Sequence, residues 1–182
     1  MTKANALTLL RILLVPVFLV ILYIGFPGSD WAALAVFIVA SLTDLLDGWT
    51  ARHFHEVSNL GKFMDPLADK VQVCAAMCWL VQRGSMAGWV LAAVLLREFA
   101  VSGLRLVAVE RGRVIAAAWS GKVKTASTMV CLCLMLVFHL PWMDLLCQAI
   151  ILCTTLYSGA EYFWKNIHVF RERKLHRHSK AP

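Results

Sequence analysis

The chain has 182 residues, of which 60% are hydrophobic and 16% are charged. Ordinary soluble domains are about 45–50% apolar and about 25% charged, so this composition excludes a disordered chain and disfavours a small soluble domain. The net charge is +7. In a membrane protein, such a charge indicates cytoplasmic loops and anionic lipid headgroups rather than nucleic acid.

Six apolar segments, separated by polar or turn-rich stretches, predict six transmembrane helices. In chain order they cover about residues 12–26, 31–52, 64–81, 86–109, 119–140 and 145–164. The first segment resembles a signal peptide, but the segments that follow favour a retained span. Pro66 suits the first turn of a helix, and Asp65 just before it suits an N-cap. We therefore expect an all-α, polytopic membrane protein with one domain over residues 1–182.

Basic residues gather on one side of this predicted topology. The connections at 27–30, 82–85 and 139–144 hold a single basic residue, Arg83, whereas the N-terminus, 52–62, 110–124 and the tail hold most of the others. By the positive-inside rule, both termini are then cytoplasmic. The basic tail, residues 165–182, is expected to lie on anionic lipid in the cytoplasm. No targeting segment is evident, which favours a bacterial cell (inner) membrane over an organelle.

Four aspartates lie near the cytoplasmic ends of the second and third predicted spans. Asp44 and Asp47 are three residues apart, and Asp65 and Asp69 are four apart, so each pair occupies one helical face. A charge at the centre of a membrane costs at least about 2.5–3.5 kcal/mol and indicates a functional site. Four carboxylates can share a pocket only if cations neutralise them, and oxygen ligands favour Mg²⁺ or Mn²⁺ over zinc. The spacing therefore suggests a site for two metal ions, as in phosphoryl transfer.

A transporter and a membrane scaffold are the alternatives to an enzyme. A divalent-cation transporter also needs intramembrane carboxylates, but usually has paired repeats and sites near the membrane midplane. No repeat is evident here, and the aspartates lie toward one end of their spans. A membrane scaffold without catalytic activity would not need four clustered aspartates. The six cysteines lack the spacing of a zinc site.

The aspartates belong to a longer pattern, Asp44-x2-Asp47-Gly48-x2-Ala51-Arg52-x8-Gly61-x3-Asp65-x3-Asp69. This pattern resembles the signature of the CDP-alcohol phosphatidyltransferases at all eight fixed positions. Members of that family are six-helix membrane proteins, usually dimers, that transfer a phosphatidyl or similar group from a CDP-linked donor to an alcohol and release CMP.

The resemblance implies a role for each residue of the pattern. Asp44, Asp47, Asp65 and Asp69 would bind two Mg²⁺ or Mn²⁺ ions, and Asp69 would also act as the general base. The nucleotide would contact Gly48, Arg52 and Gly61. The resemblance also implies a homodimer. The active site is expected on the cytoplasmic side, because the aspartates lie near the cytoplasmic ends of their spans.

Two further features bear on the nucleotide and the acceptor alcohol. Asn5-x2-Thr8-x2-Arg11 resembles the N-terminal segment of family members that use glycerol 3-phosphate, so Asn5 and Thr8 are candidate nucleotide contacts, with helix capping as the alternative. A set of cations on the fourth and fifth spans would form a basic pocket for the phosphate of the acceptor. The set consists of Arg97, Arg105, Lys122 and Lys124. A structural Arg97–Glu98 ion pair and ordinary positive-inside charge at the lysines are the alternatives.

These features together predict the transfer of a phosphatidyl group from CDP-diacylglycerol to sn-glycerol 3-phosphate, giving phosphatidylglycerophosphate and CMP. The alternative is the same chemistry with another acceptor, such as inositol phosphate, or phosphatidylglycerol as in cardiolipin synthesis. The expected partners are the two substrates, membrane lipids and a second copy of the chain, and no nucleic acid.

Overall fold

The computed structural model describes the backbone of residues 3–54, 59–110 and 118–166, and the side chains of residues 9–43, 68, 70–109 and 118–166. These residues form six α-helices and no strand, which confirms the prediction of an all-α protein. The helices are α1 (Lys3–Ile24), α2 (Ser29–Phe54), α3 (Asn59–Arg83), α4 (Gly88–Glu110), α5 (Trp119–Val137) and α6 (Pro141–Asn166). Of the basic tail, residues 167–182 lie outside the described residues.

Two helices, α5 and α6, are long and apolar enough to cross a membrane. Shorter apolar stretches lie in α1, at Leu9–Ile24, and in α2, at Ser29–Thr43. This pattern supports membrane association, because apolar helices of this length match the hydrocarbon core of a bilayer. Six spans and cytoplasmic termini stay predictions.

Three helix starts differ clearly from the sequence-based prediction. α1 begins at Lys3, well before the predicted start at 12. α3 begins at Asn59, so Asp65 and Pro66 lie inside the helix and the predicted N-cap at Asp65 is wrong. α6 begins at Pro141, several residues before the predicted start at 145. The carbonyl of Leu140 accepts a hydrogen bond from the amide of Asp144 at 2.9 Å, which places Pro141 in the first turn, where it needs no amide hydrogen. Hydropathy therefore located the apolar part of these helices and missed their polar extensions.

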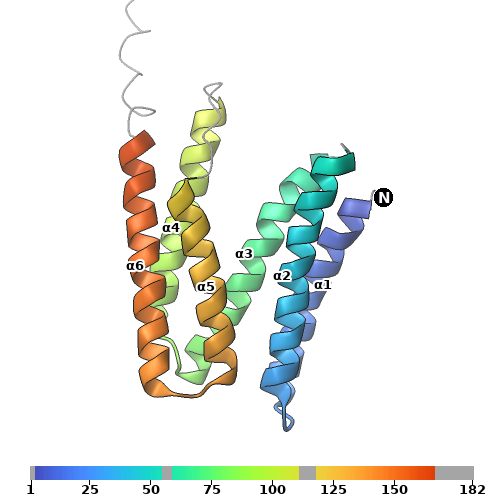
Figure 1. The fold of residues 1–182 in the computed structure, drawn as a ribbon, viewed down its shortest axis with the longest axis vertical. Helices are drawn as coiled ribbons and strands as arrows, with labels where there is room; N and C mark the ends of the chain where they lie inside the picture. Colours follow the sequence, from blue (N-terminus) through green and yellow to red (C-terminus); the bar gives the residue numbers. More distant parts are fainter. Residues whose placement is uncertain (1–2, 55–58, 111–117, 167–182) are drawn as a thin grey trace, which may run out of the picture. The chain divides into compact units, whose positions relative to one another are not determined.

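The chain divides into two compact units. Unit 1 consists of Met1–Ala87 and Leu132–Leu145, and unit 2 of Gly88–Cys131 and Leu146–Pro182. The expectation of one domain stays a prediction. In unit 1, α1 packs against both α2 and α3 (Figure 1). The rings of Phe18 on α1 and Phe37 on α2 have centroids 5.8 Å apart, within a core of buried alanine, methionine and leucine side chains.

Arg83, at the end of α3, contacts the end of α5 and the start of α2. Its guanidinium donates hydrogen bonds to the carbonyls of Met135 and Leu136, near the end of α5, and lies 4.0 Å from the carboxylate of Asp30. The pKa of Arg83 is lowered, because the effect of burial is larger than the opposing effect of the charges of Asp30 and Asp144. Carbonyls at the end of a helix lack partners within the helix, so Arg83 has a structural role in satisfying them.

Unit 2 contains α4, the first part of α5 and most of α6. Val101 and Leu104 of α4 form a core cluster with Tyr162 of α6. Two glycines, one on α5 and one on α6, lie next to the Arg97 side chain. A Cβ atom at Gly159 would lie 3.3 Å from Cγ of Arg97, and one at Gly121 would lie 3.6 Å from its Nη2 atom. A larger residue at Gly159 would crowd Arg97, whereas a Cβ atom at Gly121 would make an ordinary van der Waals contact.

Candidate functional site

The acidic pattern of the sequence lies on two helices of unit 1. Asp44, Asp47, Gly48 and Arg52 are in α2, and Gly61, Asp65 and Asp69 are in α3. The helical backbone agrees with the predicted spacing of each aspartate pair on one face, and α2 and α3 contact each other. The side chains of all seven residues lie outside the described residues, so their predicted roles stay predictions.

The chemistry of this donor set fits a hard divalent cation. All four candidate ligands are carboxylates, and they come from two neighbouring helices of the same compact unit. Oxygen donors of this kind are the ligands that Mg²⁺ and Mn²⁺ prefer. We therefore keep the two helices as a candidate metal site.

Gln72 links α2 and α3 close to the aspartates. The Nε2 atom of this buried side chain donates to the carbonyl oxygen of Phe37 at 2.9 Å and to the hydroxyl of Ser41 at 3.0 Å. Gln72 lies three residues after Asp69, and Ser41 lies three residues before Asp44. The two hydrogen bonds therefore fix how α2 packs on α3 within about one turn of the acidic pattern. The only signal in the sequence was a glutamine at helical spacing from Asp69.

Arg11 is a second residue that sequence reasoning did not assign to the site. It lies on α1 and is 0% exposed, in a buried stripe with Val15, Phe18 and Leu22. A buried guanidinium is stable only with compensating partners, and Arg11 is not without an interaction partner. Because α1 contacts both α2 and α3, Arg11 places a fixed positive charge in the unit that carries the four aspartates. The side chains of Asn5 and Thr8, also on α1, lie outside the described residues.

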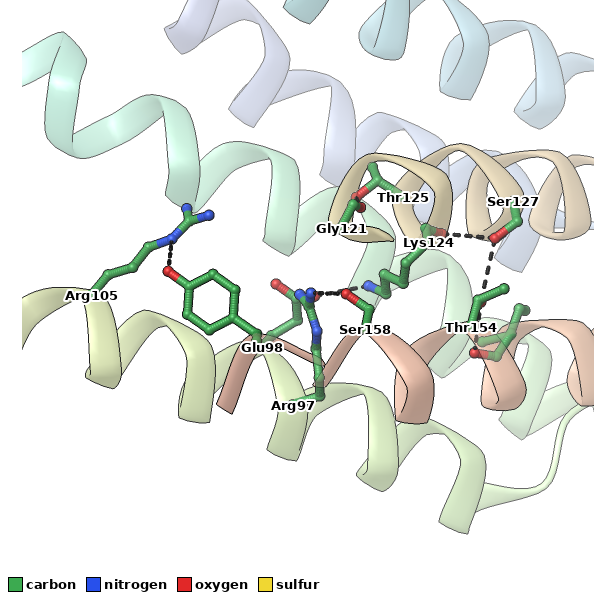
Figure 2. A network of polar contacts seen from close by, with 11 residues as sticks. Arg97, Glu98, Arg105, Gly121, Lys124, Thr125, Ser127, Thr154 and Ser158 are labelled. Atoms are coloured by element: carbon green, nitrogen blue, oxygen red, sulfur yellow. Dashed lines mark hydrogen bonds and ion pairs between the residues drawn. The ribbon is translucent and has the colours of Figure 1, made fainter. Parts of the chain in front are cut away.

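Three of the predicted acceptor cations make polar contacts in unit 2, and two of them meet at Glu98 (Figure 2). Oε1 of Glu98 accepts hydrogen bonds from Nη1 of Arg97 at 2.9 Å and from Nζ of Lys124 at 2.8 Å. Nη2 of Arg97 also donates to the Ser158 hydroxyl on α6 at 2.6 Å. The structural ion pair of Arg97 with Glu98, kept above as an alternative, is therefore present and includes Lys124.

Arg105 has a partner of its own. Its Nε atom donates to the hydroxyl of Tyr162 on α6 at 2.9 Å, and its Cζ atom lies 5.5 Å from the centroid of the tyrosine ring. The Arg105 side chain is exposed, whereas Tyr162 is buried. Neither Ser158 nor Tyr162 was predicted, because each is about 60 residues from its arginine along the chain and no local motif connects them.

Two other described residues of unit 2, Lys122 and Glu161, lie apart from these contacts. Lys122 is exposed and, within the described part of the chain, does not join Arg97, Lys124 or Arg105. Glu161 pairs with Lys165 one turn later on α6. The predicted acceptor set thus divides into a bonded pair, a separately held arginine and an exposed lysine.

Comparisons with known proteins identify the family. The family model of CDP-alcohol phosphatidyltransferase matches residues 1–158. A Bacillus subtilis protein named CDP-diacylglycerol–glycerol-3-phosphate 3-phosphatidyltransferase is 40% identical over 181 residues, covering 89% of this chain and 93% of the relative.

Relatives from two other bacteria agree. A probable phosphatidylglycerophosphate synthase of Mycobacterium tuberculosis strain H37Rv is 37% identical, covering 87% of this chain and 78% of the relative. An Escherichia coli K12 protein with the same name as the Bacillus relative is 40% identical over 69% of this chain and 71% of its own length. The resemblance seen in the sequence is thereby confirmed: the chain belongs to the CDP-alcohol phosphatidyltransferase family.

Proposed function

We propose that this protein transfers the phosphatidyl group of CDP-diacylglycerol to sn-glycerol 3-phosphate, forming phosphatidylglycerophosphate and releasing CMP. The observation that carries this proposal is the similarity, over most of the chain, to bacterial relatives named for this donor and this acceptor. The acidic pattern on α2 and α3 supports the reaction class, and the cations of unit 2 support an acceptor that carries a phosphate.

In this proposal, Asp44, Asp47, Asp65 and Asp69 hold two divalent cations, Mg²⁺ or Mn²⁺. The cations, when bound, neutralise the diphosphate of the donor and make its β-phosphorus a better electrophile. Asp69 also accepts the proton of the primary hydroxyl of the acceptor. That oxygen forms a bond to the β-phosphorus while the bond from this phosphorus to the CMP oxygen breaks. Asn5, Thr8, Gly48, Arg52 and Gly61 contact the nucleotide.

The phosphate of the acceptor binds to the cations of unit 2, namely Arg97, Arg105, Lys122 and Lys124. Arg97, Lys124 and Glu98 together carry one net positive charge, and Arg105 and Lys122 add two more. An alcohol without a phosphate would not need this excess of cations. Guanidinium groups also suit phosphate oxygens because they donate two parallel hydrogen bonds.

The membrane setting is part of the same proposal. Six spans with both termini in the cytoplasm place the acidic pattern at the cytoplasmic side of a bacterial cell membrane, and the active form is a homodimer. The apolar helices α5 and α6 and the similarity to bacterial relatives support the membrane assignment.

A panel of acceptors tests the proposed function. Purified protein in detergent receives CDP-diacylglycerol and Mg²⁺, and CMP release is followed with glycerol 3-phosphate, inositol phosphate, phosphatidylglycerol, glycerol or no acceptor. We expect release with glycerol 3-phosphate alone. Release with a different acceptor would refute the proposed substrate but keep the family chemistry. Folded protein that releases no CMP with any acceptor would refute the proposed reaction.

A further inference from the structure

Arg105 is held in a way that leaves part of its guanidinium available. Nε is its bonded nitrogen, and within the described residues neither Nη atom has a partner. Figure 2 shows both Nη atoms directed away from the phenolic ring. Two terminal amino groups side by side match the spacing of two phosphate oxygens. The side chain is therefore arranged to receive an anion.

The partner of Arg105 differs in charge from that of Arg97 and Lys124. These two cations share the carboxylate of Glu98, which cancels one positive charge and would compete with a phosphate. Tyr162 is neutral, so its hydroxyl fixes the position of Arg105 without cancelling its charge. An arginine held by a neutral group keeps its full attraction for a dianionic phosphate monoester.

Tyr162 is itself firmly placed. Its side chain is 2% exposed and packs with Val101 and Leu104 of α4. Val101 lies one helical turn before Arg105, and Leu104 is the residue directly before it. The residue lies beyond residue 158, where the match to the family model ends. Its position was therefore found from the structure and not from the family pattern.

We propose that Tyr162 is a positioning residue that holds Arg105 ready for the phosphate of the acceptor and so contributes to the choice of a phosphorylated acceptor. This inference rests on the proposed function, in which Arg105 binds that phosphate. A tyrosine needed only for packing would act through its ring. A tyrosine that positions Arg105 acts through its hydroxyl.

The variant Tyr162→Phe separates these roles because it keeps the ring and removes the hydroxyl. The matched control is Tyr157→Phe on the same helix, whose side chain is 68% exposed. Arg105 keeps its charge in this variant and loses only the bond that orients it, so KM for glycerol 3-phosphate should rise about three- to tenfold. We expect unchanged kcat, KM for CDP-diacylglycerol and melting temperature, and no change in the control.

Arg105→Gln and the double variant show whether Tyr162 acts through Arg105. We expect Arg105→Gln to raise KM for glycerol 3-phosphate about 10- to 100-fold, and Tyr162→Phe to add nothing in that background. The inference would be overturned by an unchanged KM in Tyr162→Phe. It would also be overturned if Tyr162→Phe raised KM as much in the Arg105→Gln background as in the wild-type protein. Either result would leave the proposed function standing. If Arg105→Gln also left KM unchanged, the proposed acceptor site itself would be wrong.

Discussion

Arg11 in unit 1 and Arg105 in unit 2 are both cations on helices with a high apolar content, but the two units surround them differently. Arg11 is 0% exposed and lies among the packed side chains of α1. Arg105 is exposed, and a buried tyrosine holds it by one nitrogen. Arg11 therefore has the surroundings of a cation that serves the fold, whereas Arg105 has those that we propose for a cation that binds a ligand. Burial and partners separate the two uses, whereas residue type does not.

The same contrast applies to the charges of each unit as a whole. Unit 1 carries the four aspartates of the pattern, which need cations from outside the chain or a resident one such as Arg11. Unit 2 carries an excess of cations, part of which is already neutralised by Glu98. We infer that unit 1 is completed by metal ions and unit 2 by an anionic substrate.

The largest expected effect concerns the acidic pattern of unit 1. Asp69→Asn removes a metal ligand and the proposed base, so the rate of CMP release should fall about 10³-fold or more. The matched control is Asp30→Asn in the same unit, which lies outside the pattern and should retain most of the activity. A normal rate in Asp69→Asn would exclude Asp69 as the base.

Metal binding to unit 1 has a readout that does not depend on turnover. Chelation should abolish CMP release, and Mg²⁺ or Mn²⁺ should restore it. The same ions should raise the melting temperature of the wild-type protein, because a ligand that binds only the folded state stabilises it. The rise should be smaller in Asp69→Asn. An equal rise in both proteins would place the metal elsewhere.

The next effect is on stability, and it compares the loss of Arg11 with the loss of Arg105. Arg11 is fully buried, and replacing it leaves the group it interacts with uncompensated, at a cost of about 1–3 kcal/mol or more. Arg11→Gln should therefore lower the melting temperature strongly, whereas Arg105→Gln should leave it nearly unchanged. Thermal unfolding in detergent measures both. Similar melting temperatures for the two variants would remove the distinction between a cation of the fold and a cation of the site.

The smallest effect concerns Glu98. Glu98→Gln removes the carboxylate that Arg97 and Lys124 share, so we expect the melting temperature to fall by a few degrees. Dependence on Mg²⁺ should stay as in the wild-type protein, because Glu98 is outside the acidic pattern. If instead the metal requirement changed, Glu98 would belong to the metal site and its role in unit 2 would need revision.

Local spacing predicted the helical placement of the acidic pattern, because carboxylates three or four residues apart share a helical face whatever the rest of the chain does. It also allowed for the Arg97–Glu98 pair, whose members are adjacent. Contacts between distant residues could not be predicted in this way. Gln72 meets Phe37, and Tyr162 meets Arg105, only after the helices have packed. The burial of Arg11 likewise depends on its neighbours, since Lys or Arg near the start of a span is usually read as an interfacial charge.

The central claim is that cations of unit 2 select an acceptor that carries a phosphate. The most direct measurement is kcat/KM for glycerol 3-phosphate relative to glycerol, compared between the wild-type protein and Arg105→Gln. We predict that the wild-type protein strongly prefers glycerol 3-phosphate and that the preference falls about 10- to 100-fold in the variant. An unchanged preference in a folded variant that still releases CMP would contradict the claim.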